Sequence, residues 1–340
     1  AFPKADPGRS AHGPGAFDNR VRGHMNPDTP VDSPEEPEQP DRSFHLKHHE
    51  KPGEGIRRVA LGRADSALEG LRGLGSADDE ASTIHGVRKD LKKLRSTVRM
   101  VRSELGEKKF KKLNRLLGDA GRELSSSRDA QIKVETLDSM TSDHAEARLA
   151  CSQWRVDLLA EERKSEAHTG SGEMAALDDA IAKAEEARRM IAKWSFKPGA
   201  DELIDEGLVV SYRKGRKAMK AARAETTPEN MHEWRKRAKD LWYQLRIIRK
   251  AWPDLIGGMS DMADELTDLL GDHHDFVVLA EDLKGREMAD ADRKTLEAAI
   301  EEFQNELAED AFELGGRVYA EKPKELRKRM RRYWKVWRRS

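Results

Sequence analysis

The 340-residue sequence contains a single cysteine, Cys151, so an internal disulfide bond is excluded. Such scarcity of cysteine is typical of proteins in a reducing compartment and argues against a small disulfide-stabilised secreted domain. Long apolar runs are also missing, because no stretch approaches the ~18 residues that a membrane-spanning helix requires. No signal peptide is evident in the sequence. We therefore expect a cytoplasmic protein that does not enter a membrane.

The chain has a formal net charge of zero at pH 7, because 63 Lys and Arg residues balance 63 Asp and Glu residues. Bulk charge therefore does not attract a polyanion, and any such activity requires basic residues to be segregated on one surface. Aromatic residues make up only 6% of the chain, whereas charged residues make up 37%. This balance is typical of helical bundles with modest cores. No alternating strand pattern of useful length is present, so we predict an all-α fold.

The first 42 residues differ in composition from the rest of the chain. They contain eight prolines and few large aliphatic residues, which predicts a disordered tail over residues 1–42. The tripeptide Gly23-His24-Met25 is typical of a cloning remnant, so residues 1–24 are interpreted as an expression leader. We expect the folded domain to cover residues 43–340.

Residues 84–102, with the sequence IHGVRKDLKKLRSTVRMVR, carry two parallel rows of side chains. Apolar residues recur every three or four positions from Ile84 to Val101, which predicts a helix with one buried face. A second row follows the first by one residue, so it lies directly beside the buried face. The members of this row are His85, Arg88, Lys92, Arg95, Arg99 and Arg102.

The same double pattern returns in the second half of the chain, which indicates an internal repeat. The segment NMHEWRKRAKDLWYQLRIIRK, from Asn230, aligns with the segment from Thr83. Its second row comprises His232, Arg235, Lys239, Trp242, Arg246 and Arg249. We predict two repeats, residues 43–197 and 198–340, joined near Pro198 and Gly199, with about four long helices in each.

Two other predicted helices carry basic rows of the same kind. These rows are Arg213, Arg216, Lys220 and Arg223 in one helix, and Arg327, Arg331, Trp334 and Arg338 in the other. Unpaired charges in a dry core cost several kcal/mol, so the rows are not expected to point into packed interior. We predict two pseudo-symmetric bundles around a basic central channel, which would attract an extended polyanion. Arg and Lys bind phosphate oxygens well, and His adds an N–H donor.

The pattern H-x-x-R-K-x-x-K occurs twice, at His85-Arg88-Lys89-Lys92 and at His232-Arg235-Lys236-Lys239. Together with FHLK from Phe44, YRKGRKAMKAAR from Tyr212 and AEKPKELRKRMRRYWKVW from Ala320, it resembles the CHAD domain family (conserved histidine α-helical domain). The resemblance implies two four-helix repeats around a basic pore that binds inorganic polyphosphate, and association with polyphosphate granules. No strand-rich triphosphate-tunnel segment accompanies these motifs, which indicates a stand-alone form.

We predict that the His, Lys and Arg residues of the four rows, together with Lys89 and Lys236, bind polyphosphate. We predict no cofactor, no metal ion and no catalytic residue. The two repeats differ in charge, because Asp240 stands where the first repeat has Lys93. The helix after the motif is also basic in the first repeat and acidic in the second, with Asp261, Asp264 and Asp268. We therefore expect the first repeat to bind more strongly.

Two alternative functions deserve comparison with polyphosphate binding. The sequence Asp272-His273-His274-Asp275 is compatible with an HD-type metal-dependent phosphohydrolase. Only the last aspartate recurs in the first repeat, as Asp129, so we expect it to cap a helix or to hold a neighbouring basic side chain. Single-stranded nucleic acid is the other alternative, but only Trp242 and Trp334 lie in the basic rows as candidate base-stacking residues. We favour it less.

Overall fold

The computed structural model describes residues 41–74, 79–124, 128–167, 171–196 and 201–340. Within these ranges the regular structure consists of thirteen α-helices and a short 3₁₀ segment, with no strand. The all-α prediction is confirmed. The predicted tail 1–42 lies outside the described residues except for Asp41 and Arg42, and so does the predicted join near Pro198 and Gly199.

Four helices of the first half pack against one another. They are α1 (Pro52–Gly73), α2 (Glu80–Met100), α4 (Glu107–Arg122) and α8 (Ser171–Ala192), with the short α3 (Arg102–Leu105) between α2 and α4. Asp79 begins α2 as its N-cap, because its side chain accepts a hydrogen bond from the Ser82 N–H at 2.9 Å. Gly106 adopts φ 73° between α3 and α4, a conformation that glycine allows without strain.

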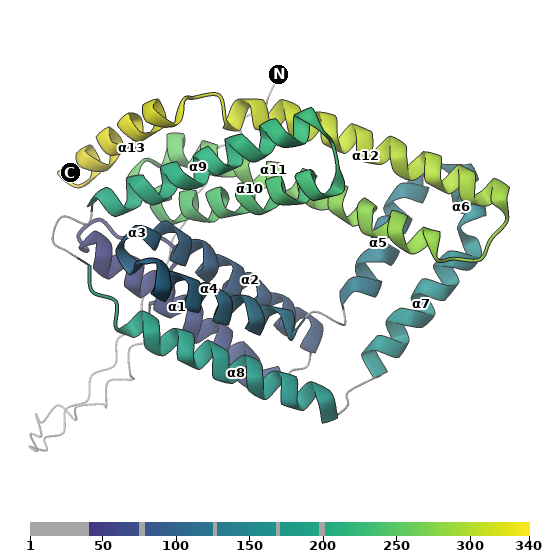
Figure 1. Cartoon of the computed structure of the whole chain (residues 1–340), viewed down its shortest axis with the longest axis horizontal. Helices are drawn as coiled ribbons and strands as arrows, with labels where there is room; N and C mark the ends of the chain where they lie inside the picture. The colour runs from purple at the N-terminus through teal and green to yellow at the C-terminus, as the bar shows by residue number, and fades with distance from the viewer. Residues whose placement is uncertain (1–40, 75–78, 125–127, 168–170, 197–200) are drawn as a thin grey trace, which may run out of the picture. The chain divides into compact units, whose positions relative to one another are not determined.

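The second half contains five helices that follow one another along the chain. They are α9 (Asp201–Ala224), α10 (Pro228–Ile248), α11 (Pro253–Lys284), α12 (Asp290–Val318) and α13 (Pro323–Trp337). Proline opens α10, α11 and α13, where its missing N–H costs nothing. Consecutive helices from α9 to α12 pack together, and α13 packs on α9 (Figure 1).

A separate small core joins the two halves away from the main one. The helices α5 (Arg128–Asp143), α6 (Ala145–Ala150) and α7 (Ser152–Ala167) belong to the first half of the sequence, but α5 and α6 pack on α11 and α12, and α7 packs on α5 (Figure 1). The buried residues of this core include Leu137, Trp154 and Leu279. Cys151 is buried in the same core, as expected for a structural cysteine.

The two motif helices, α2 and α10, contact each other directly. The Ser96 hydroxyl donates to the Asp240 carbonyl at 2.9 Å, and the Gln244 amide donates to the Ser96 carbonyl at 3.2 Å. Nearby, α9 approaches the end of α2 so closely that a Cβ atom on Gly207 would lie 2.0 Å from the Met100 carbonyl oxygen. The pseudo-symmetric arrangement and the single central channel stay predictions.

Candidate anion-binding site

A cavity of about 970 Å³, here called cavity one, opens among α2, α5, α10 and α11. Its basic wall is formed by α2, by α10 and by the 3₁₀ segment Arg249–Ala251. The basic lining residues are His85, Arg88, Lys89, Lys92, Arg235, Lys239, Arg246 and Arg249. The structure thus brings members of both sequence motifs to one space.

Most cations of this basic wall are not neutralised by the protein. Arg88, Lys89, Lys92, Arg235 and Lys239 form no ion pair with any described carboxylate. Burial and the neighbouring Lys239, Arg88 and Arg235 lower the pKa of Lys92 to about 8. The pKa of Lys239 is lowered by burial and by Arg235. Because like charges are crowded here, a bound anion would relieve their repulsion.

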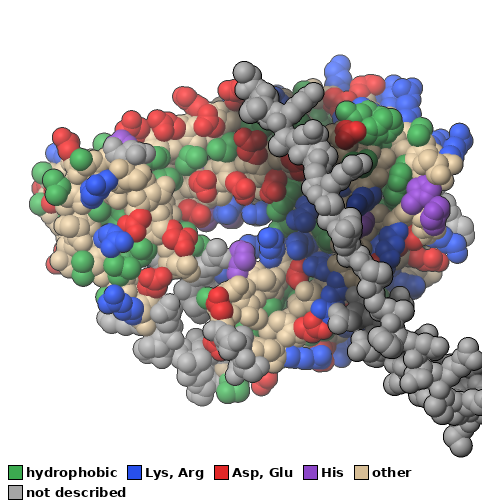
Figure 2. All heavy atoms as spheres, turned by 180° about the vertical axis from the view of Figure 1, so that it is seen from behind, with side chains coloured by type: hydrophobic (Ala, Val, Ile, Leu, Met, Phe, Trp, Pro, Cys, Tyr) green, Lys and Arg blue, Asp and Glu red, His purple; other side chains and the backbone are tan. Residues whose placement is uncertain are grey.

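The opposite wall of cavity one is acidic. Its carboxylates recur every three or four residues along α11, so they form one stripe on that helix: Asp261, Asp264, Asp268, Asp272 and Asp275. Asp261 lies 3.3 Å from Arg249 and closes one end of the stripe against the basic wall. Burial and neighbouring aspartates raise the pKa of Asp264 and of Asp272. In the space-filling view of Figure 2, Asp and Glu side chains lie next to Lys and Arg side chains along the hollow in the middle of the molecule.

A second cavity of about 830 Å³, cavity two, collects other predicted residues. Its cations are Arg99, Arg102, Arg213, Lys214, Arg237 and Arg327. Several of them are already paired: Arg99 lies 2.7 Å from Asp240, Arg102 lies 2.8 Å from Glu107, and Arg327 lies 3.2 Å from Glu206. Most arginines of cavity two are thus held in ion pairs, whereas most cations on the basic wall of cavity one are not.

The remaining predicted residues line neither cavity. Three of them donate to backbone carbonyls: Arg216 to Glu321 at 2.9 Å, Arg223 to Phe312 at 2.9 Å and Arg338 to Glu50 at 2.8 Å. Lys236 pairs with Glu233 at 3.2 Å, and Arg95 donates to the Asn114 side chain at 3.4 Å. Lys220 is exposed, and Arg331 is half-buried. The four basic rows therefore include residues that donate to backbone carbonyls of neighbouring segments as well as residues that line a cavity.

His232 does not line cavity one, but its ring packs at an angle of 35° against a second histidine that does. Its ring centroid is 4.7 Å from that of His274, which lines cavity one. Burial and the proximity of His274 lower the pKa of His232 to about 4. His232 is therefore neutral at pH 7, so it contributes packing rather than positive charge to the empty site.

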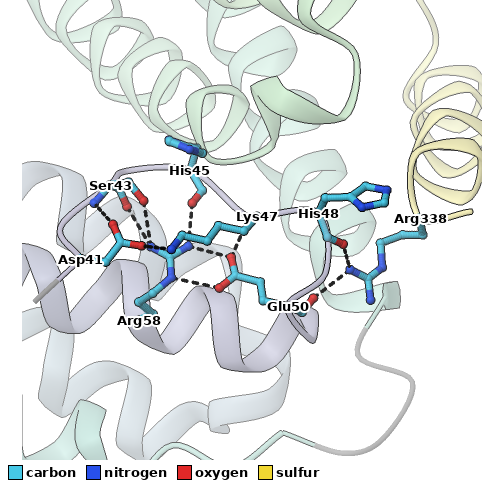
Figure 3. A network of polar contacts seen from close by, with 8 residues as sticks. All are labelled: Asp41, Ser43, His45, Lys47, His48, Glu50, Arg58 and Arg338. Carbon is cyan, nitrogen blue, oxygen red and sulfur yellow. Dashed lines mark hydrogen bonds and ion pairs between the residues drawn. The ribbon is translucent and has the colours of Figure 1, made fainter. Parts of the chain in front are cut away.

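Residues 41–51, here called the strap, precede α1 and run along that helix (Figure 3). Arg58 of α1 donates to the His45 carbonyl at 2.8 Å and to the Glu50 carboxylate at 2.6 Å. The Leu46 N–H donates to the Ile247 carbonyl of α10 at 2.8 Å. Arg338, just after α13, donates to the Glu50 carbonyl. The strap therefore connects three helices that are distant in sequence.

Phe44 of the strap contacts Tyr243 and Arg246, two residues of α10 that line cavity one. Its ring contacts Tyr243 edge-on at 6.3 Å between centroids, and Arg246 lies 5.8 Å from the Phe44 centroid. Arg246 also lies 5.3 Å from the Trp242 ring. The guanidinium is thus held by two aromatic rings while it lines cavity one. Helical periodicity gave no signal for Phe44, because this residue precedes the first helix.

The structure also places the residues of the two alternative functions. Trp242 and Trp334 are only 8% and 7% exposed, and of the two only Trp242 lines cavity one. Asp275 lies inside α11 rather than at a helix end, and it lines cavity one 3.5 Å from His274, so of the two expected roles it has the contact with a neighbouring side chain and not the cap. Among the described residues, no group of three or more His, Cys, Asp or Glu is placed to hold a metal ion. The side chain of Asp129 lies outside the described part of the chain.

These helices and the cavity between the two motif helices define an all-helical domain with a candidate anion site. The sequence profile of the CHAD domain matches residues 58–284, so the chain belongs to the CHAD domain family. The crystal structure of the CHAD domain from the plant Ricinus communis is similar, with a TM-score of 0.54 and 14% sequence identity. The match covers 85% of this chain and 98% of that chain, and it shows the shared fold.

No curated protein sequence matches the chain. Across the described residues, none of the helices is both long enough and apolar enough to span a lipid bilayer.

Proposed function

We propose that this protein is a module that binds inorganic polyphosphate on the basic wall of cavity one. The observation that supports the proposal best is the convergence of Arg88, Lys89 and Lys92 with Arg235 and Lys239, none of which is paired with a described carboxylate. These residues come from both copies of the sequence motif. Arg binds phosphate oxygens in bidentate fashion, and Lys provides a compact charge.

The wider assignment is part of the same proposal. Residues 43–197 and 198–340 would form the two repeats around a basic channel, with cavity one as its principal binding segment. The protein would act in the cytoplasm, where it would associate with polyphosphate granules. The cations of cavity two would contribute less, because four of its arginines, Arg99, Arg102, Arg237 and Arg327, are paired with carboxylates.

Single-stranded nucleic acid is a weaker candidate for this site. A groove that binds single strands combines phosphate contacts with aromatic rings on which the bases stack. The aromatic residues that line cavity one are Trp242, Tyr243 and Phe276, and they are only 8%, 3% and 4% exposed, so little of each ring faces the cavity. The site therefore offers contacts to phosphates without a platform for bases.

A competition experiment tests the proposal. Labelled long-chain polyphosphate is titrated with the protein at two salt concentrations, with and without excess single-stranded DNA. We expect tight binding that DNA does not displace and that weakens steeply with salt, because binding releases counterions from the polyanion and added salt makes this release less favourable. A complex that is insensitive to salt, or that DNA displaces at equal phosphate concentration, would contradict the proposal.

The same proposal excludes turnover. We expect phosphate release from polyphosphate or nucleoside triphosphates to stay at background with Mg²⁺, Mn²⁺ or Zn²⁺ present. Turnover that disappears in His274→Ala and Asp275→Ala would show instead that the Asp272–Asp275 segment is a hydrolase centre.

A further inference from the structure

The acidic wall of cavity one has no function in a site for a bare polyanion. The cavity is lined by seven Lys and Arg residues and by six Asp and Glu residues, so its lining is nearly neutral overall. A phosphate chain on the basic wall would turn its outer oxygens toward the carboxylates of α11. Like charges held this close repel one another strongly when water is partly excluded.

The carboxylates of this wall are available to a ligand. Asp264, Asp268 and Asp272 form no ion pair with any described residue. They lie within electrostatic reach of the basic wall, because Asp268 and Asp264 raise the pKa of Lys239 against the effect of burial. Because they recur at intervals of four residues, they are spaced by about 6 Å along α11. The two walls therefore face the same ligand space with opposite charge.

We propose that cavity one binds polyphosphate as its complex with divalent cations, with phosphate oxygens on the basic wall and the cations between the chain and the aspartates of α11. This inference rests on the proposed function. Mg²⁺ is usually held by one or two carboxylates together with phosphate oxygens and water, rather than by a cage of protein ligands. The stripe on α11 offers such carboxylates one after another, which suits a polymer that carries cations along its length.

The test compares polyphosphate affinity in millimolar Mg²⁺ and in Na⁺ alone, at matched ionic strength. The wild-type protein is expected to bind more tightly in Mg²⁺, on the order of tenfold, because the cations remove the repulsion from α11. The variant Asp264→Asn/Asp268→Asn/Asp272→Asn is expected to bind more tightly than the wild type in Na⁺ and to gain little from Mg²⁺. Its thermal melting curve checks that it is folded.

A matched control removes the same charge elsewhere. Glu301, Glu302 and Glu306 are exposed residues of α12 and do not line cavity one. Their replacement by Gln should leave the Mg²⁺ dependence as in the wild type. Wild-type binding that is equal in both buffers, or weaker in Mg²⁺, overturns this inference and leaves the proposed function standing. Absence of binding in both buffers overturns both.

Discussion

Arg99 of α2 and Asp240 of α10 form an ion pair of 2.7 Å where the two motif helices meet. The Asp240 side chain is buried, and burial raises its pKa although Arg99 and Arg237 act in the opposite direction. Asp240 aligns with Lys93 of the first half. A lysine in place of Asp240 would put a second positive charge beside Arg99, which accounts for the different residue at this position. The corresponding Lys93 has its own partner, Asp90, at 3.2 Å.

The variant Arg99→Gln is expected to be less stable by about 2 kcal/mol, because it leaves a buried carboxylate with only Arg237 at 3.4 Å. Equilibrium unfolding in denaturant measures the change. The double variant Arg99→Gln/Asp240→Asn should recover part of the loss, since it removes the unpaired charge. Arg99→Gln with wild-type stability would mean that the ion pair contributes nothing. The sequence row alone suggested that Arg99 is a binding residue, and the pair gives it a structural role.

Loss of three cations from the basic wall is expected to weaken binding severely without unfolding the protein. The variant Arg88→Gln/Lys92→Gln/Lys239→Gln should bind polyphosphate more weakly by a factor on the order of a thousand or more, because each charge-assisted contact contributes about 1.5–3 kcal/mol. It should melt at the same or a higher temperature, because no ion pair is broken and like-charge repulsion falls.

The control for this variant removes three exposed lysines outside the cavities, in Lys294→Gln/Lys322→Gln/Lys335→Gln. Titration with labelled polyphosphate should show little change. Equal weakening in the two variants would indicate a diffuse basic surface, and unfolding of the cavity variant would indicate that these residues stabilise the helices.

Lys92 predicts a specific pH dependence of binding. Its pKa in the empty cavity is about 8, below the ordinary value of 10.5. A bound polyanion favours the charged ammonium, so the complex must take up a proton once the pH exceeds about 8. Affinity should therefore fall between pH 8 and 10.5, while the empty folded protein gains stability over the same window, because the unfolded chain holds the extra proton there.

Calorimetry in two buffers of different ionisation enthalpy measures this proton uptake directly. The variant Lys92→Arg stays charged throughout the window and should lose most of the pH dependence. Unchanged pH dependence in Lys92→Arg would assign the titration to another group.

Phe44 is expected to affect binding through Arg246. The single variants Phe44→Leu and Arg246→Gln should each weaken polyphosphate binding, and the double variant should be little worse than Arg246→Gln. A coupling energy of about 1 kcal/mol is expected, as for a cation held over an aromatic ring. Binding titrations of the four proteins complete the cycle. Additive losses would show that Phe44 acts independently of Arg246.

The sequence predicted the fold class and the helix faces because spacing in a helix is local. The rows from His85 and from His232 follow the helical period, and the structure brings much of both to cavity one. Their division between two cavities could not be predicted, because it depends on how α2 crosses α10 and on partners such as Asp240. The same holds for α5 and α6, which pack on helices of the other half. Phe44 could not be predicted for the same reason.

The strap also limits when the chain can finish folding during synthesis. Residues near position 46 are made early, but their partners Ile247 and Arg338 appear only after most of the chain has left the ribosome. The helices α1, α2 and α4 can pack as they emerge, because domains generally begin to fold from the amino-terminal side during synthesis. The strap can contact α1 early through Arg58, but its contacts with α10 and α13 must wait, so Phe44 and Leu46 lack part of their partners for most of translation. A chaperone that binds short apolar segments would find its target there, at the start of the nascent domain.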